Sequence, residues 1–274
     1  MSLAQSADQR VTQTLASGTI IRQDFRTATR FVFFDTGVDE WQWATHGGTL
    51  FVVAYRGKPY AITCRHVFQS FDWGQLIVSA EQFGGTRAPL RYIAYPSSPV
   101  EAAIDTDLMD VAVIQFDDDV DLGLFKDTAY VIDDNTVATS SVDDILHVHG
   151  ALKTPSEITE NTIAPKFGLL ELVDDTPYSN DPTLRRGFGL FDRPEFQDVV
   201  GLSGSPVFNV TRSALCGMVV RGTMARDACT LWYVDMFDIC RLLASVSEGR
   251  TSAYYHKTQT SLVRVPSKHA ERQP

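Results

Sequence analysis

The sequence contains few cysteines and no long apolar run. Its 274 residues include four cysteines and no C-x-x-C pair; they are Cys64, Cys216, Cys229 and Cys240. These spacings do not match those of zinc sites, and in a reducing compartment we expect four free thiols, no metal and no cofactor. No apolar run approaches the roughly 20 residues that span a bilayer, so we expect no transmembrane helix.

Basic residues are also scarce, with 24 Lys and Arg against 34 Asp and Glu and a formal charge of −10. This acidic balance argues against a nucleic-acid binder and against docking on an anionic membrane. The first residues, MSLAQSADQRVTQTLASG, lack the basic and then apolar segments of a signal peptide, which predicts a cytoplasmic protein. The chain does have 44% hydrophobic residues, enough for the core of one large or two small domains.

Short β-strand patterns recur along the whole chain. The segment TLFVVAYRGKPYAITC (49–64) predicts two strands joined by a turn at Arg56–Gly57–Lys58, with Pro59 opening the second strand. Other short apolar runs bounded by polar or turn residues are LIVSA, PLRYIAY, DVAVIQF, ILHVHG, FGLLELV, SPVFNV, LCGMVVRG and TLWYV. Regularly spaced short strands favour a β-barrel or sandwich over alternating β/α units.

One segment, VDMFDICRLLASVSEG (234–249), has the residue spacing of a helix. Its apolar residues recur every three or four positions, as on one face of an amphipathic helix. Asp235 is the expected N-cap and Gly249 the expected stop.

The polar run VATSSVDD (137–144) is the best internal boundary, because it divides the predicted strands into two comparable sets. We therefore expect a first unit over residues 1–140 and a second unit, ending in the helix, over residues 141–250. Residues 251–274 have the composition of a poorly ordered or partner-dependent tail.

Three segments carry residues suited to nucleophilic catalysis. His66 follows a strand in TCRHVF, Asp110 opens a strongly apolar strand in TDLMDVAVIQF, and Ser203 lies in the G-x-S-G turn of GLSGSPVF. Each alone has an ordinary explanation: a strand-end histidine, an aspartate bonded to backbone amides, and a tight turn. Their order along the chain, His then Asp then Ser, is that of chymotrypsin-type enzymes and not of subtilisins or α/β-hydrolases.

With these motifs in place, the chain resembles the trypsin/chymotrypsin-like serine protease superfamily, in particular its bacterial, high-temperature-requirement-like branch without a PDZ domain. ITCRHVF, DVAVIQF and GLSGSPVF are similar to the histidine, aspartate and serine motifs of that family, and LCGMVVRGT (215–223) is similar to the strand that borders the substrate. The resemblance covers roughly residues 45–250. It implies an all-β fold of two antiparallel six-stranded β-barrels with a C-terminal helix and the site in the cleft between them.

The resemblance also implies a serine endopeptidase. A serine hydroxyl needs a base within hydrogen-bond reach, which His66 supplies, while Asp110 fixes the imidazole tautomer. The backbone N–H groups of Gly201 and Ser203 face the developing oxyanion. Peptide or protein substrates are the expected partners.

Three residues depart from the family pattern. Leu202 precedes the serine where zymogen-activated members carry an aspartate, which predicts a site that needs no new N-terminus, or one that a partner or substrate orders. Ser205 replaces a second glycine in the serine loop. Val220 stands where a serine often supports the catalytic aspartate, so Asp110 is expected to have one partner fewer.

Substrate specificity is only partly readable from the sequence. The candidate substrate-binding residues are Gln197, Val220, Arg221 and Gly222. Gln197 lies where trypsin-like members carry an aspartate, which argues against strict cleavage after Lys or Arg. Arg221 either favours an acidic side chain in the substrate or is a solvated arginine, and we prefer the second interpretation.

Other clusters have simpler structural explanations. HVH (147–149) resembles part of a metal site but lacks a third ligand, and the acidic run DDDVD (117–121) lacks the glycine-directed spacing of a calcium loop. Alternative functions remain open: a catalytically inert protease-like module that binds peptides or acts as a scaffold, and a domain regulated by a protein partner.

Overall fold

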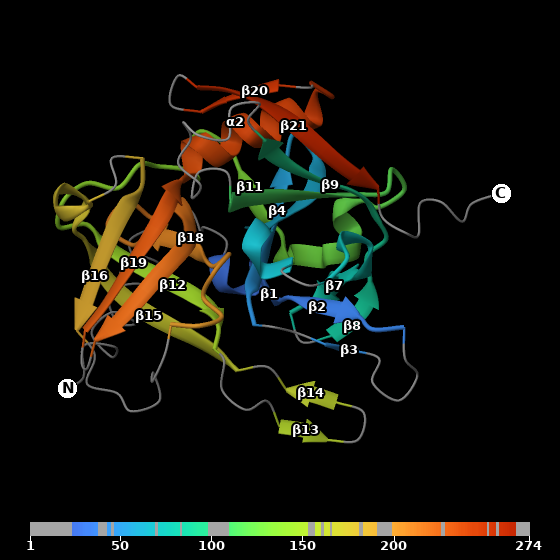
Figure 1. Cartoon of the computed structure of the whole chain (residues 1–274), viewed down its shortest axis with the longest axis horizontal. Coiled ribbons are helices and arrows are strands. Elements are labelled where there is room, and N and C mark those ends of the chain that lie inside the picture. Colours follow the sequence, from blue (N-terminus) through green and yellow to red (C-terminus); the bar gives the residue numbers. More distant parts are fainter. Residues whose placement is uncertain are drawn as a thin grey trace.

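The computed structural model describes residues 24–37, 43–44, 47–68, 71–82, 84–97, 110–152, 157–159, 162–164, 166–180, 183–190, 199–225, 228–250, 252–255 and 258–266. Within these residues the chain is mostly β-structure with one α-helix, in two halves that lie side by side (Figure 1). None of the helices described there is long and apolar enough to cross a bilayer.

The second half is a closed six-stranded barrel. Its strands pair in the order β12 (Ile145–Ala151), β15 (Phe167–Asp174), β16 (Arg185–Leu190), β19 (Ala228–Asp235), β18 (Ala214–Ala225) and β17 (Pro206–Asn209), which returns to β12. All of these pairs are antiparallel. Alternate apolar residues of β15 point inward, as expected for a strand with one buried face.

The first half is built on an eight-stranded sheet. Seven strands pair in the order β1 (Thr29–Phe31), β4 (Thr49–Tyr55), β5 (Lys58–Cys64), β10 (Val111–Phe116), β9 (Leu90–Ser97), β21 (Thr258–Pro266) and β20 (Ser252–Tyr255). The eighth, β11 (Tyr130–Ile132), pairs in parallel with β4.

The remaining elements are short. The other strands are β2 (Phe33–Asp35), β3 (Trp43–Ala44), β6 (Leu76–Ile77), β7 (Ser79–Glu81), β8 (Gly84–Arg87), β13 (Glu157–Thr159) and β14 (Thr162–Ala164). The single-turn or short 3₁₀ helices are η1 (Phe25–Ala28), η3 (Arg65–Phe68), η4 (Trp73–Gln75), η6 (Leu122–Thr128) and η7 (Thr176–Tyr178).

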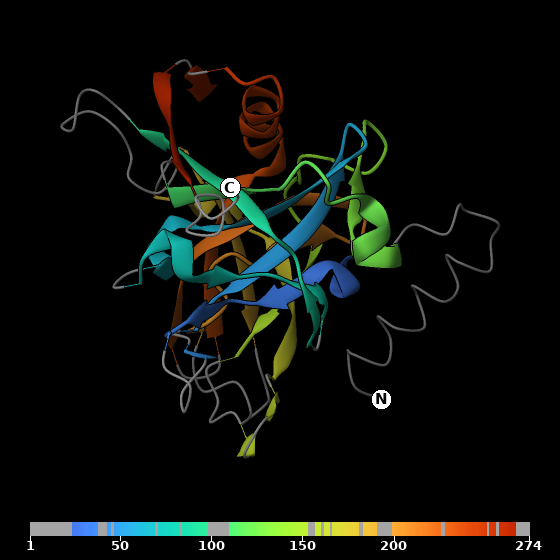
Figure 2. The same ribbon diagram turned by 90° about the vertical axis from the view of Figure 1, so that its right-hand side faces the viewer.

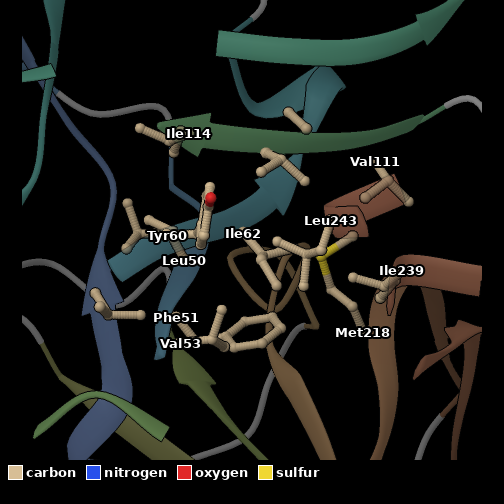
Figure 3. Close-up of a cluster of buried hydrophobic side chains, with 14 of the residues drawn as sticks. Leu50, Phe51, Val53, Tyr60, Ile62, Val111, Ile114, Met218, Ile239 and Leu243 are labelled. Atoms are coloured by element: carbon tan, nitrogen blue, oxygen red, sulfur yellow. The ribbon is translucent and has the colours of Figure 1, made fainter. Parts of the chain in front are cut away.

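The α-helix α2 (Met236–Ser247) follows the last barrel strand directly and packs on the other half of the molecule. Asp235 caps its first turn by accepting a hydrogen bond from the Phe237 N–H at 2.9 Å, and Gly249, at φ +69°, ends it in the left-handed conformation. Ile239 and Leu243 of the helix lie beside Met218 of β18, in the larger apolar cluster, which joins the first sheet, α2 and part of the barrel wall (Figure 3).

A second, separate apolar cluster fills the closed barrel. The chain between the first sheet and the barrel, residues 137–144, is hydrogen-bonded to the barrel. Ala138 N–H donates to the Leu215 carbonyl at 3.0 Å, and the buried Asp174 accepts from the Ser140 hydroxyl. The boundary predicted from the polar run VATSSVDD therefore lies between the last strand of the first half and the first strand of the barrel.

The predicted fold class is confirmed, with two differences. The first half pairs, in the described residues, as an eight-stranded sheet and not as a closed six-stranded barrel. The prediction of a poorly ordered tail is wrong for residues 252–255 and 258–266, which form the hairpin β20–β21 and extend the first sheet at β9. Figure 2 shows this hairpin next to α2, above the sheet.

Candidate active site

Strand pairing brings the predicted histidine and aspartate together. The antiparallel register of β5 and β10 places Val111 opposite Cys64. Asp110, one residue before Val111, therefore lies beside the residues that follow Cys64, and these form the short helix η3 that carries His66. This register brings together His66 and Asp110, which are 44 positions apart in the sequence.

Asp110 binds His66 through both carboxylate oxygens. Oδ1 accepts a hydrogen bond from the His66 backbone N–H at 2.8 Å, and Oδ2 contacts the ring Nδ1. Because a carboxylate only accepts, this contact assigns the ring proton to Nδ1 and leaves Nε2 as an acceptor. The Asp110 side chain is 14% exposed and the His66 side chain 43%, so the carboxylate is shielded while the ring reaches solvent.

The loop that carries Ser203 is held by the first residue of β4. The Thr49 N–H donates to the Ser203 carbonyl at 2.9 Å, and the Thr49 hydroxyl donates to the Gly201 carbonyl at 2.8 Å. Gly204 is at φ +85°, and a Cβ there would lie 1.9 Å from the Thr49 carbonyl oxygen. The G-x-S-G turn thus needs glycine because the two halves of the molecule meet at this point.

Two backbone amides of the serine loop, those of Gly201 and Ser203, have no acceptor among the described residues. Among the described residues, neither the Gly201 N–H nor the Ser203 N–H donates a hydrogen bond to the chain. Gly201 adopts φ +102°, a conformation that glycine tolerates and other residues avoid. Two backbone N–H donors, one of the serine itself and one two residues before it, can stabilise a negatively charged oxygen.

The predicted contact between Ser203 and His66 is not formed. Within the described part of the chain, the Ser203 hydroxyl makes no hydrogen bond. The structure therefore brings His66 and Asp110 into contact and places Ser203 in a glycine-bounded loop without joining it to the pair. In enzymes without substrate, such hydrogen bonds are often long and tighten only in the complex.

Cys64 is a site residue that the sequence analysis missed. Its Sγ donates to the Val219 carbonyl at 3.1 Å, and the side chain is fully buried. The Sγ, a ring nitrogen of His66 and a carboxylate oxygen of Asp110 all lie within 4.8 Å of one another. The available signal was its position two residues before His66, at the end of the strand that pairs with Val111.

The departures from the family pattern are visible in the structure. Leu202 is buried and apolar, and its carbonyl accepts from the Ser205 N–H at 2.9 Å. The Ser205 hydroxyl is buried without a hydrogen-bond partner. Val220 is also buried and apolar. In the described residues, the Asp110 carboxylate forms hydrogen bonds with His66 and with no other residue. Within the described residues, no hydroxyl group donates to this carboxylate.

The predicted substrate-binding residues are only partly described. Gln197 lies outside the described residues. Val220 sits at a bulge of β18 between Val219 and Arg221. The Arg221 guanidinium packs over the Trp232 ring at 5.1 Å. A Cβ on Gly222 would lie 2.4 Å from Leu231 Cδ2, so this glycine permits close packing of β18 on β19.

The two histidines of HVH have separate structural partners. His147 Nε2 contacts Glu171 Oε2 at 3.2 Å, and His149 Nδ1 contacts the Thr29 hydroxyl at 3.1 Å. Burial lowers the pKa of His149 to about 4. Neither residue belongs to a group of three metal-ligating side chains in the described chain. Asp121, from the acidic run, caps η6 by accepting from the Leu124 N–H at 3.2 Å.

Comparison with solved structures identifies the fold. The chain is similar to human heparin binding protein with a TM-score of 0.53 and 12% identity, over 83% of this chain and 95% of that one. It is similar to the scabies mite inactivated protease paralogue S-D1 with a TM-score of 0.54 and 10% identity, over 86% and 98%. A serine endoprotease from Yersinia pestis gives a TM-score of 0.51 and 14% identity over 83% of this chain. The match covers 65% of the Yersinia chain, just under two thirds.

These similarities establish the trypsin/chymotrypsin-like serine protease fold and nothing finer. No protein-family model matches the sequence, and no curated protein matches it. The structures with this fold include an endoprotease, an inactivated protease paralogue and a heparin-binding protein. The chemistry must therefore be argued from the residues of this chain.

Proposed function

We propose that the protein is a serine endopeptidase that hydrolyses peptide bonds through an acyl-enzyme on Ser203. The observation that carries this proposal is the contact between Asp110 and His66. A single shielded carboxylate engages both the backbone N–H and the ring Nδ1 of a half-exposed histidine. This arrangement fixes the tautomer in which Nε2 can accept a proton, which an inert strand-end histidine does not require.

In the proposed reaction Ser203 is the nucleophile, His66 the base and then the acid, and Asp110 the group that orients His66. As the Ser203 Oγ attacks the substrate carbonyl carbon, its proton passes to His66 Nε2, and the Asp110 carboxylate stabilises the imidazolium. The N–H groups of Gly201 and Ser203 donate to the oxyanion, where loss of one donor typically raises the barrier by about 3–4 kcal/mol. His66 then gives the proton to the leaving amine, and water hydrolyses the acyl-enzyme in the second half of the reaction.

One observation favours a second candidate, a catalytically inert module that binds peptides. The Ser203 hydroxyl is not hydrogen-bonded to His66 in the described residues, and an inert site has no need of that bond. The two candidates make different demands on the serine. A peptidase needs it within reach of the base when substrate is present, whereas a binding module tolerates its removal.

A fluorophosphonate probe separates the two candidates. The purified protein and its Ser203→Ala variant are treated with the probe, and intact mass is measured. A peptidase gives a single adduct on the wild type and none on the variant. Absence of the adduct on folded wild-type protein, both alone and with a library of peptides present, would contradict the peptidase and support the binding module.

The same experiment tests the proposed mode of activation. Because Leu202 is buried and apolar, it cannot pair with a newly formed N-terminal ammonium. We therefore expect the adduct to form on the intact chain, without prior proteolysis. Labelling that appears only after limited proteolysis would show that the site is activated by cleavage.

A further inference from the structure

Cys64, whose thiol can bind a metal ion, lies beside His66 and Asp110 in the candidate active site. The Cys64 Sγ, a His66 ring nitrogen and an Asp110 carboxylate oxygen all lie within 4.8 Å of one another. Thiolate sulfur, imidazole nitrogen and carboxylate oxygen are the ligands that Zn²⁺ takes from proteins. We propose that these three side chains bind one Zn²⁺ ion, and that the bound ion switches the site off.

The backbone under the three ligands is fixed by strand pairing. Cys64 is the last residue of β5, its partner Val111 is the first of β10, and the other two ligands are their near neighbours in the sequence. A tetrahedral zinc site with bonds of about 2.0–2.3 Å places its ligand atoms roughly 3.3–3.8 Å apart. Because the ligand atoms lie within 4.8 Å of one another, the more distant ones need to approach by at most about 1.5 Å, and His66 Nδ1 and Asp110 Oδ2 must separate to admit the ion.

Access to the ion comes through the histidine. Cys64 is fully buried, but the His66 side chain is 43% exposed. Rotation of the ring therefore opens the space between Nδ1, the carboxylate and the thiol to solvent. The same opening leaves room for a water molecule as the fourth ligand of a tetrahedral zinc ion.

The charges and protons of the binding step balance. The thiol, which donates to the Val219 carbonyl, releases its proton to solvent, and a sulfur–zinc bond replaces the S–H bond. The ring proton moves from Nδ1 to Nε2 as Nδ1 binds the ion. One thiolate and one carboxylate offset the two positive charges of the ion, so the site changes from the single negative charge of Asp110 to neutral and holds no uncompensated buried charge.

Binding would remove the two properties that the proposed mechanism needs. Once Nδ1 ligates zinc, Nε2 carries the ring proton and cannot accept one from Ser203. The Asp110 carboxylate is occupied as well. This inhibitory consequence rests on the proposed peptidase function, whereas the binding of the ion does not.

The binding is tested with Co²⁺ as a spectroscopic substitute for Zn²⁺. Cobalt bound to a thiolate gives a charge-transfer band in the near ultraviolet, which Zn²⁺ abolishes by competition. We expect this band in the wild type and in Ser203→Ala, and its loss in Cys64→Ala. Cys216→Ala is the matched control, because Cys216 is another buried strand thiol that donates to a carbonyl, that of Val207 at 3.3 Å. The cobalt band of the Cys216→Ala variant should be the same as that of the wild type.

The strength of binding and its effect on labelling complete the test. We expect Zn²⁺ to bind Cys64→Ala at least about 100-fold more weakly, because loss of even an outer partner of a metal ligand costs roughly 10–100-fold. Zn²⁺ should also suppress fluorophosphonate labelling of the wild type. If Cys64→Ala does not fold, Cys64→Ser, which keeps the side-chain shape, serves for the same spectrum.

The possible outcomes separate the two proposals. Absence of the band in the wild type, or a band that survives in the Cys64 variants, overturns the metal site. A Cys64-dependent band in a protein that takes no fluorophosphonate supports the metal site and contradicts the peptidase. A band together with labelling that zinc leaves unchanged overturns the switch.

Discussion

Replacing Asp110 by asparagine tests whether the carboxylate sets the position of the ring proton on His66. Asparagine has almost the same shape, and its oxygen can still accept the His66 backbone N–H that Oδ1 now accepts at 2.8 Å. Its amide nitrogen then faces Nδ1 and donates to it. Nδ1 becomes an acceptor, the ring proton moves to Nε2, and the base that Ser203 requires is lost.

The expected loss of reaction rate is large because the substitution changes the position of the proton that the reaction transfers. In a Ser-His-Asp arrangement, the wrong tautomer lowers the rate about 10⁴-fold, which corresponds to roughly 5.5 kcal/mol of barrier. Asp110 has no other hydrogen-bond partner in the described residues, so no second donor holds the carboxamide in a productive orientation. We expect the full loss.

The assay is the second-order rate constant of fluorophosphonate labelling at neutral pH, read by intact mass. Asp118→Asn is the control, since Asp118 is an exposed carboxylate that pairs with Arg91 at the surface, and this variant should label at the wild-type rate. ¹⁵N shifts of the His66 ring report the tautomer directly, even in protein that does not label. An Asp110→Asn protein that folds and labels within about tenfold of wild type would refute the reasoning.

Three further predictions concern stability. Leu243→Ala should cost about 3 kcal/mol and lower the Tm by roughly 6–12 °C in calorimetry, because the side chain is fully buried between α2 and the first sheet. Gly204→Ala should cost roughly 2–5 kcal/mol in urea unfolding, since its φ is +85° and its Cβ would collide with the Thr49 carbonyl. The third prediction concerns His149, whose pKa is ordinarily 6.5 but is about 4 in the folded protein. As the pH falls, the unfolded chain therefore binds a proton on this histidine at a higher pH than the folded protein does. Stability should therefore be highest above pH 6.5 and decline by roughly 3 kcal/mol towards pH 4, and His149→Asn should flatten this slope in urea melts.

Each of the stability predictions has a result that contradicts it. A Tm change below 2 °C for Leu243→Ala would mean that the helix repacks without a cavity. A Gly204→Ala protein as stable as wild type would mean that the serine loop moves away from Thr49. An unchanged pH dependence in His149→Asn would assign the acid sensitivity to other groups.

Elements with strong local patterns were predictable from the sequence. The helix follows from its apolar spacing, with Asp235 as the cap and Gly249 as the stop. The hairpin of β4 and β5 follows from two apolar runs around Arg56 and Gly57, which adopt φ +50° and +77° as a two-residue turn demands. In both cases the signal lies within about 16 neighbouring residues.

The C-terminal hairpin was not predictable in the same way. TSAYYHKTQTSLVRVP is polar and has no strong apolar alternation, so its composition resembles that of a tail. Its strand conformation comes from pairing with β9, in which Val265 lies opposite Ile93. A strand fixed by a partner so distant in the sequence leaves little local signal, because β propensity depends on what the strand packs against.

The residue types of the candidate site were predictable, but the place of Cys64 beside His66 and Asp110 was not. His66, Asp110 and Ser203 stand out by motif and order, and the structure confirms the contact between the first two. The place of Cys64 depends on the register that sets it opposite Val111, which the spacing of the cysteines alone does not reveal. The expectation against a metal rested on that spacing.

The pairing of β21 with β9 has a consequence for the order in which the molecule is assembled. Val265 and Ile93 are 172 positions apart (265 − 93), whereas the closed barrel uses only the contiguous strands from residue 145 to residue 235. Apart from β20, the other strands of the first sheet are synthesised before the barrel, but we expect β9 to remain an open edge until β21 leaves the ribosome. Thr49, which holds the serine loop, belongs to the same sheet. A nascent chain therefore carries Ser203 beside an unfinished first sheet until β21 has been added.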